Sequence, residues 1–185
     1  GPTGAPGRTT VAVNLAAEHA VAGRNTLLVD LDTYGPAVGV HLGLTEESAG
    51  VSRAVRRADH GRLGAADLAS AGVRVRVAGA DLTVLTGLTR VDRWPELRPA
   101  AVSALIAAAR EHWDRVVVDV GFGLEQDEEL SFDVPAPQRN GATLAALAAA
   151  DEVIAVGGPD AVALPRLVRG VEELAEAARR IAAAP

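Results

Sequence analysis

The sequence contains no cysteine, no methionine and no lysine, and each absence narrows what the protein can be. Without cysteine the chain forms neither disulfides nor thiolate metal sites, which fits a reducing compartment. All 18 basic residues are arginines, so any site that needs a positive charge must use a guanidinium. Because methionine is missing even at position 1, we expect the chain to be a piece of a longer protein.

Long hydrophobic runs are missing as well. No apolar stretch approaches the roughly 20 residues that span a bilayer, and no signal peptide is visible, so we expect a cytoplasmic protein. The net charge of -6 argues against broad affinity for nucleic acid. The densest basic cluster, Arg53, Arg56 and Arg57, is expected to be a solvated helix face. With 185 residues, 49% of them hydrophobic, the chain is large enough for one domain with its own core.

Short apolar runs predict the strands of a parallel sheet. The runs at 25–32, 114–121 and 151–158 are rich in β-branched residues, are apolar on both faces and end in Asp or Gly, as buried parallel strands do. A fourth strand is expected at 82–88. The alternating run at 73–77 indicates an edge strand or a hairpin arm.

Helical patterns separate these strands, at residues 9–22, 95–113, 140–150 and 161–183. Gly23 is expected to cap the end of the first helix, and Asn140 to cap the start of the third. Alternating strands and helices imply right-handed crossovers and a sheet covered on both faces. We therefore predict one α/β domain over residues 1–185, with a mostly parallel twisted sheet flanked by helices. The first strand and the last strands of that sheet are expected to lie outside the given chain.

The segment GAPGRTT, from Gly4 to Thr10, predicts a phosphate-binding loop that leads into a helix. Gly4 and Gly7 permit backbone angles that turn successive N–H groups toward an anion. The helix that follows adds the positive end of its dipole and its free amides. The hydroxyl of Thr9 is of the kind that binds Mg²⁺ between two phosphates. The alternative is an ordinary Gly/Pro loop that caps a helix.

Together with the stretch TTVAVNLAAEHAVAGRNTLLVDLDTYGP, this loop resembles the ParA/MinD family of deviant P-loop ATPases, whose loop reads KGGxGKTT. Gly4 and Ala5 stand at the paired glycines of that motif, Pro6 at its variable place and Gly7 at its last glycine. The two threonines, Thr9 and Thr10, match. Members of the family have the P-loop NTPase fold. The resemblance therefore implies that the loop residues named above, together with Arg8, bind ATP with Mg²⁺.

The family pattern continues beyond the loop, at the carboxyl ends of two predicted strands. By this resemblance Asp32, the second aspartate of Asp-x-Asp, holds the attacking water, while Asp30 or Asp119 completes the Mg²⁺ site with Thr9. The first switch of the family corresponds to DTYGP, which contains Tyr34 and Gly35. The second switch corresponds to VVVDVGFGLE, in which Gly121 replaces the usual proline and Gly123 keeps the final glycine.

Two departures from the family pattern concern charge. Both lysines of the motif are missing: Thr3 stands at the first, so it cannot activate a partner's nucleotide, and Arg8 stands at the second. Arg8 keeps a positive charge that can fork two phosphate oxygens. The segment 124–140, LEQDEELSFDVPAPQRN, is unusually acidic and is either a solvated loop or an element that binds a partner.

This segment and GAPGRTT make the chain most similar to actinobacterial CpaE-type members, which are pilus-assembly or septum-site proteins. The resemblance implies an ATP-linked homodimer that positions a pilus, secretion or cell-division complex and is a slow ATPase if it hydrolyses ATP at all. A non-hydrolysing interaction scaffold with a degenerate loop is the main alternative. A biosynthetic P-loop amidoligase is a third reading, although no site for a substrate carboxylate is apparent.

Overall fold

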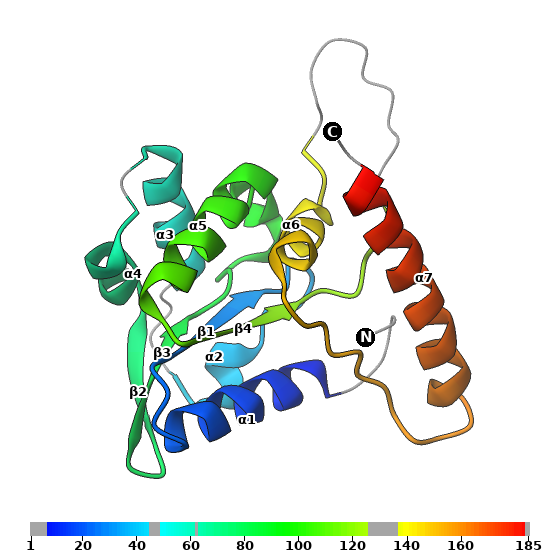
Figure 1. Ribbon diagram of the computed structural model, residues 1–185, viewed down its shortest axis with the longest axis horizontal. Helices are drawn as coiled ribbons and strands as arrows, with labels where there is room; N and C mark the ends of the chain where they lie inside the picture. Colours follow the sequence, from blue (N-terminus) through cyan, green and yellow to red (C-terminus); the bar gives the residue numbers. More distant parts are fainter. Residues whose placement is uncertain (1–6, 45–48, 62, 126–136, 184–185) are drawn as a thin grey trace.

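The computed structural model describes residues 7–44, 49–61, 63–125 and 137–183 (Figure 1). The described elements, in chain order, are α1 (Arg8–Val21), β1 (Thr26–Leu31), α2 (Val38–His41), α3 (Gly50–Asp59), α4 (Ala65–Ala71), β2 (Val73–Val77), β3 (Ala80–Leu85), the 3₁₀ helix η1 (Val91–Glu96), α5 (Pro99–His112), β4 (Arg115–Val120), α6 (Gly141–Ala149) and α7 (Ala163–Ala183).

The four strands form one sheet in the order β2-β3-β1-β4. β1 is parallel to both β3 and β4, and in the β1–β4 register Asp30 lies opposite Asp119. β2 pairs antiparallel with β3 through a tight turn in which Ala78 and Gly79 both have positive φ, as two-residue hairpins require. The predicted mostly parallel sheet is confirmed, and 73–77 is the hairpin arm at its edge.

Helices cover both faces of this sheet (Figure 1). The side chains of β1 alternate between the two faces, as the pleat of a strand dictates. Leu27, Val29 and Leu31 pack with α3, α4, α5 and α6, whereas Leu28 packs with α1 on the other face. All six residues of β1 are buried, which explains why its sequence is apolar on both sides.

The first helix and its ends match the sequence prediction closely. α1 begins directly after Gly7 and is followed by Gly23, whose φ of 81° is left-handed. The N–H of Gly23 donates to Ala20 O, and the N–H of Arg24 donates to His19 O, so two carbonyls of the last turn are satisfied. The predicted C-cap is confirmed, and α1 lies along the sheet with its first turn beside the carboxyl ends of β1 and β4.

One predicted helix is wrong in part. The helix expected at 95–113 is divided: Pro95 lies inside η1, and α5 begins only at Pro99. The reason is local, because a residue before proline disfavours helical angles and Arg98 accordingly has ψ 142°. Three short helices lie between β1 and β2. Of these, only α3, which carries the arginine cluster, was predicted; α2 and α4 were not.

The strand expected at 151–158 is also wrong, since this segment has no regular structure. Among the described residues, β4 is at the edge of the sheet, and no backbone hydrogen bond joins it to 151–158. A strand needs a neighbour for its ladder, and the apolar sequence alone does not supply one. The segment still passes beside the start of α1, where Val156 Cγ1 lies 3.8 Å from the Cβ position of Gly7.

The arginine cluster is confirmed as the exposed face of a helix, α3. Two of its members also attach α4 to the body of the protein. Arg57 forms an ion pair with Asp67, and Arg53 Nη2 donates to Ala71 O over 2.6 Å. These contacts are within the chain, so the cluster is in part a structural clamp.

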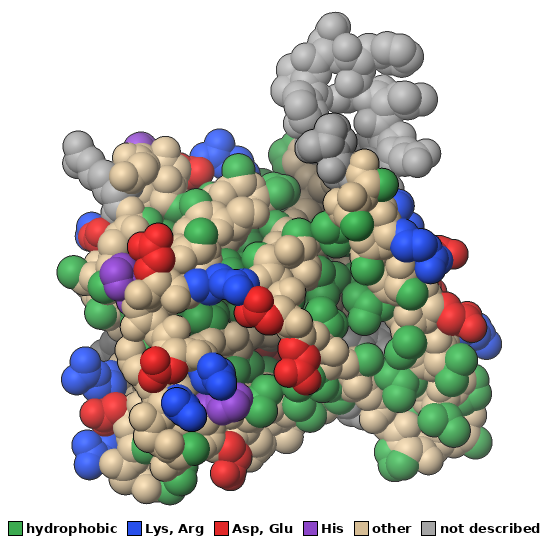
Figure 2. Space-filling view, viewed as in Figure 1, with side chains coloured by type: hydrophobic (Ala, Val, Ile, Leu, Met, Phe, Trp, Pro, Cys, Tyr) green, Lys and Arg blue, Asp and Glu red, His purple; other side chains and the backbone are tan. Residues whose placement is uncertain are grey.

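α7 lies at the side of the molecule against α6 (Figure 1). One row of apolar residues on this helix, Leu164, Val168 and Val171, is exposed, and hydrophobic side chains are prominent on this part of the surface in Figure 2. Within the described ranges, no helix is both long enough and apolar enough to cross a membrane.

Gly87, just after β3, provides a first test of this packing. A Cβ at this position would collide with Pro36 and lie 2.8 Å from Asp30 Oδ2. We expect Gly87→Ala to lower the free energy of unfolding by about 2 kcal/mol, because overpacking in a closed site costs roughly this much. Urea unfolding measures the change. The control is Gly39→Ala in α2, where the new Cβ meets Thr86 at an ordinary 3.7 Å and alanine favours the helix. Equal stabilities for the two variants would contradict the close approach at Gly87.

Candidate functional site

The start of α1 meets the carboxyl ends of β1 and β4. Gly7 is the N-cap residue, with φ 101°, and the first helical hydrogen bond runs from Val11 N to Gly7 O over 2.8 Å. The first amides of an α-helix have no acceptor within the helix, so this end attracts anions. The predicted loop residues Gly4, Ala5 and Pro6 lie outside the described residues, whereas Gly7, Arg8, Thr9 and Thr10 are at this helix end.

Two side chains of the first turn of α1 contact the predicted aspartates. Thr9 Oγ1 donates to Asp119 Oδ2 over 2.6 Å, and Arg8 Nη2 donates to Asp32 Oδ2 over 3.3 Å. Both aspartates are buried, which strengthens these contacts relative to a surface pair. Thr10 lies apart from the aspartates, with its Oγ1 3.4 Å from His41 Nε2.

Asp30 is the most buried of the acidic groups, 1% exposed, and its two oxygens face backbone amides. Oδ1 accepts from Asp32 N over 3.1 Å, and Oδ2 accepts from Val38 N, the first residue of α2, over 3.0 Å. Burial raises the pKa of Asp30 to about 7 from its ordinary 3.8, with a smaller contribution from the Asp119 and Asp32 carboxylates. Burial also raises the pKa of Asp119, against the opposing effect of the Thr9 hydrogen bond.

Asp32 organises the predicted first switch. Its Oδ1 accepts from Tyr34 N over 2.8 Å and from Gly35 N over 3.0 Å, which is the local turn that aspartate favours. Its other oxygen is the partner of Arg8. One carboxylate therefore joins the first turn of α1 to the turn after β1.

The predicted second switch packs directly on the first. The Cβ position of Gly121 lies 3.2 Å from Tyr34 Cδ2 and 3.3 Å from Asp32 Oδ1, so a larger residue would push against both. Gly123 is pressed against the side chain of Asn140, whose Cγ lies 2.6 Å from the Cβ position. Phe122, between the two glycines, stacks on Tyr34 with ring centroids 4.6 Å apart. All four predicted switch residues thus belong to one contact region.

Three residues of this region were not predicted as site residues. Arg139 lies over the Tyr34 ring, and Asn140 accepts a hydrogen bond from Tyr34 Oη. Asn140 is at the N-cap of α6 as expected, but its side chain makes no capping bond and the predicted cap is wrong in that respect. Thr143 Oγ1 is fully buried near Gly121 and has no hydrogen-bond partner among the residues that the structure describes. No local pattern reveals the contacts of Tyr34 with Arg139 and Asn140, since Tyr34 and Asn140 are 106 positions apart in the sequence.

The donor atoms present suit magnesium. Mg²⁺ prefers oxygen ligands and usually keeps waters and phosphate oxygens in its shell, so it needs few protein ligands. Thr9 Oγ1 and Asp119 Oδ2 supply a hydroxyl and a carboxylate in direct contact. No group of three or more acidic or histidine ligands was found among the described residues, so a metal at this position would depend on ligands from a nucleotide and from water.

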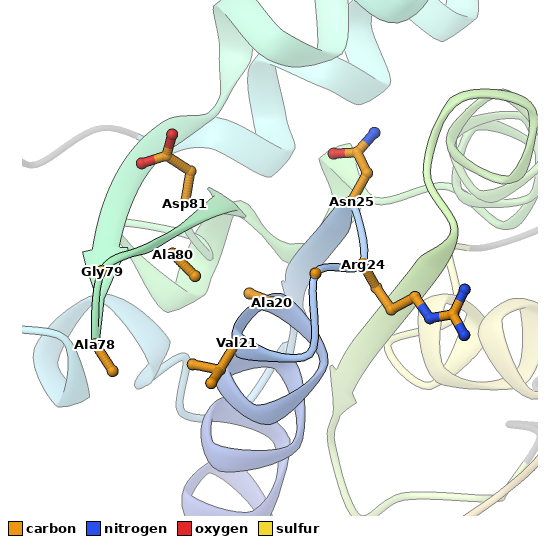
Figure 3. Close-up of a pocket in the computed structure, with 9 residues that line it drawn as sticks. Ala20, Val21, Arg24, Asn25, Ala78, Gly79, Ala80 and Asp81 are labelled. Atoms are coloured by element: carbon orange, nitrogen blue, oxygen red, sulfur yellow. The ribbon is translucent and has the colours of Figure 1, made fainter.

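A separate surface pocket lies at the opposite end of α1, between its last turn and the β2–β3 turn (Figure 3). Arg24, Asn25 and Asp81 are its polar side chains, and in the close-up they point in different directions. A binding pocket needs polar groups that converge. This surface pocket is therefore not the candidate site.

The fold can be compared with known proteins. No family model and no curated protein match the chain. The cell division ATPase MinD of Pyrococcus furiosus has a similar structure, with a TM-score of 0.63 and 19% identity over 95% of this chain and 64% of that chain. The septum site-determining protein MinD of Pyrococcus horikoshii, complexed with Mg-ADP, has a TM-score of 0.62 and 20% identity over 95% of this chain and 63% of that chain.

A third similar structure is cobyrinic acid a,c-diamide synthase of Mycobacterium smegmatis with a bound ATP analog and magnesium, with a TM-score of 0.57 and 20% identity over 94% of this chain and 65% of that chain. The chain spans less than two thirds of each of these three proteins. Identities this low show the fold alone. The chain has the α/β fold of MinD-like P-loop proteins, and the CpaE-type specialisation stays a prediction.

The raised pKa of Asp30 predicts how stability depends on pH. Because its native pKa of about 7 exceeds the ordinary 3.8, the native state holds a proton that the unfolded chain has released. The proton on Asp30 therefore stabilises the native state fully below about pH 4, and this contribution is lost as the pH rises through 7. We expect the stability of the protein relative to Asp30→Asn to fall over this range by a few kcal/mol, since one pKa unit corresponds to about 1.4 kcal/mol. Urea unfolding in EDTA at several pH values measures it, and a constant difference would contradict the shift.

The unpaired hydroxyl of Thr143 predicts a substitution that stabilises the protein. Valine has nearly the same shape but no polar group, so we expect Thr143→Val to raise the free energy of unfolding by about 1 kcal/mol. The matched control is Thr26→Val, because Thr26 Oγ1 is also buried but donates to Arg24 O over 3.0 Å. That variant should lose about 1 kcal/mol. Thermal unfolding compares the two, and a loss at Thr143 would mean that its hydroxyl has a partner in solution.

Proposed function

We propose that this chain is the nucleotide-binding domain of a ParA/MinD-like dimerisation switch of the CpaE type. It binds ATP with Mg²⁺ at the start of α1, and two copies associate across their nucleotides. The assembled form positions a pilus-assembly, secretion or cell-division complex, and the protein hydrolyses ATP slowly if at all. The observation that carries the proposal is the 2.6 Å contact of Thr9 with Asp119 at a glycine-capped helix N-terminus.

The phosphates are assigned to the loop and the first turn of α1. We assign phosphate binding to Gly4, Ala5, Pro6 and Gly7, as the loop motif implies, and to the amides of Arg8, Thr9 and Thr10 at the helix N-terminus. Thr9 and Asp119 would hold the metal, the hydroxyl as a ligand and the carboxylate through bound water. Magnesium supplies charge that neutralises the phosphate oxygens when it is bound.

Of the two acidic candidates for the metal shell, the contacts favour Asp119. Both oxygens of Asp30 already accept backbone amides, those of Asp32 and Val38. We therefore assign to Asp30 the task of shaping the chain between β1 and α2. Asp32 orients the attacking water and accepts its proton when hydrolysis occurs.

Arg8 has a double role in this scheme. Its guanidinium is paired with Asp32, and a phosphate that enters the site competes with that carboxylate for the same donor. An arginine presents a wider, planar fork than the compact ammonium of lysine, so the loop has to fit a bulkier cation against the phosphates. We assign the slow turnover to this altered fit.

The alternative is a pseudo-ATPase scaffold that keeps the fold but does not hydrolyse the nucleotide. The Arg8–Asp32 ion pair and the lack of any lysine favour it. The Thr9–Asp119 contact opposes it, because a scaffold without ligand has no need of a hydroxyl and a carboxylate at this place.

Calorimetric titration of Mg-ATP into the full-length protein tests the proposal. We expect binding in the micromolar range that weakens at least tenfold in Thr9→Ala, because the variant loses a metal ligand and leaves Asp119 unpaired. Thr26→Val, at the far end of β1, is the control and should bind as the unchanged protein does. Arg8→Lys should still bind Mg-ATP and should hydrolyse it faster than the unchanged protein does. No heat at millimolar Mg-ATP would reject the switch and favour the scaffold.

A further inference from the structure

Tyr34 is held on three sides by residues from distant parts of the chain. Its ring stacks on Phe122 at 4.6 Å, and the Arg139 guanidinium lies over the ring, 4.1 Å from its centroid. Its hydroxyl donates to Asn140 Oδ1 over 2.8 Å. A tyrosine in a turn after a strand normally has several rotamers, so this enclosure selects one.

Asn140 is itself fixed on both sides of its amide. Oδ1 accepts from Tyr34, and Nδ2 donates to Glu125 O over 2.9 Å. The side chain is buried and lies against Gly123, where any Cβ would displace it. The Glu125 carbonyl also decides which end of the amide is oxygen, since a reversed amide would place one acceptor against another, whereas the Tyr34 hydroxyl can donate or accept.

The backbone of Tyr34 acts on Asp32. Its N–H and that of Gly35 are the two donors to Asp32 Oδ1. A second tie runs in parallel, because Arg139 Nη2 donates to Thr33 O over 2.9 Å and Thr33 Oγ1 donates to Arg139 O. The position of the Tyr34 side chain therefore sets the direction in which the Asp32 carboxylate faces Arg8.

We infer that Asn140 is a positioning residue, which holds Tyr34 and through it orients Asp32 at the phosphate loop. The relevance of Asp32 to a nucleotide rests on the proposed function, whereas the Asn140–Tyr34–Asp32 connection does not. The connection explains why an asparagine at the N-cap of α6 makes no capping bond, since its amide is used by the two switches. Through Arg139 and Asn140, the residues just before α6 also contact the turn after β1 directly.

Hydrogen exchange of the Tyr34 and Gly35 amides tests the connection without any nucleotide. Tyr34→Phe keeps the stacked ring and removes only the hydroxyl, and Asn140→Ala removes its acceptor. We expect each variant to speed exchange at these two amides about tenfold, as expected when a local contact that limits opening is lost. The double variant should exchange no faster than the faster single variant, because the residues act as one unit.

Thr26→Val is the control for a general loss of stability, since it removes one buried hydrogen bond at the other end of β1. Its exchange at Tyr34 and Gly35 should be unchanged. Unchanged exchange in Tyr34→Phe, or effects of Tyr34→Phe and Asn140→Ala that multiply in the double variant, would overturn the inference.

Turnover and binding of Mg-ATP in the same variants test whether the Asn140–Tyr34–Asp32 connection affects the nucleotide. Turnover of Mg-ATP should fall about tenfold in Tyr34→Phe and in Asn140→Ala while the dissociation constant changes less than about threefold, because orientation of Asp32 affects transfer more than binding. A fall in binding alone would overturn the positioning role. If the unaltered protein neither binds nor hydrolyses Mg-ATP, the proposed function fails, and the exchange experiment still decides the connection.

Discussion

Carboxylates crowd the carboxyl ends of two neighbouring parallel strands, and the rest of the site is arranged around them. Asp30 and Asp119 are register partners, and Asp32 follows two residues after the first of them. Like charges in a buried place repel, so each group needs donors of its own or a proton. Asp30 accepts two backbone amides, and its raised pKa favours the protonated form. Asp32 accepts two backbone amides and the Arg8 guanidinium. Asp119 accepts the Thr9 hydroxyl.

These donors come from different elements, so satisfying the carboxylates also assembles the site. Thr9 and Arg8 bring the first turn of α1 to the ends of β1 and β4. The amide of Val38 brings the start of α2 to Asp30. Glycine is required where these pieces meet, because a Cβ at 87 would strike Pro36 and one at 123 would strike Asn140. Burial of polar groups that are fully paired gives a definite geometry rather than a loose one.

Arg8, in the first turn of α1, is part of the same electrostatic arrangement. A guanidinium has several donors in a plane, so Arg8 can contact Asp32 and a second acceptor at the same time. The side chains of both are largely shielded from water, and a competitor for Arg8 must offer comparable charge. A phosphate group does so. The start of α1 thus carries a cation whose partner is an internal carboxylate.

Much of this could be predicted from the sequence, and the limits have a physical origin. The sequence by itself determined β1, β4 and α1, because a strand that is apolar on both faces and a helix between two glycines are local patterns, and it singled out Thr9, Asp32 and Asp119. Only the tertiary structure decided that 151–158 has no ladder, that Asp30 faces amides, and that Asn140 reaches Tyr34 rather than capping α6. Those outcomes depend on partners that arrive from far along the chain, and local propensity carries no information about which partner arrives.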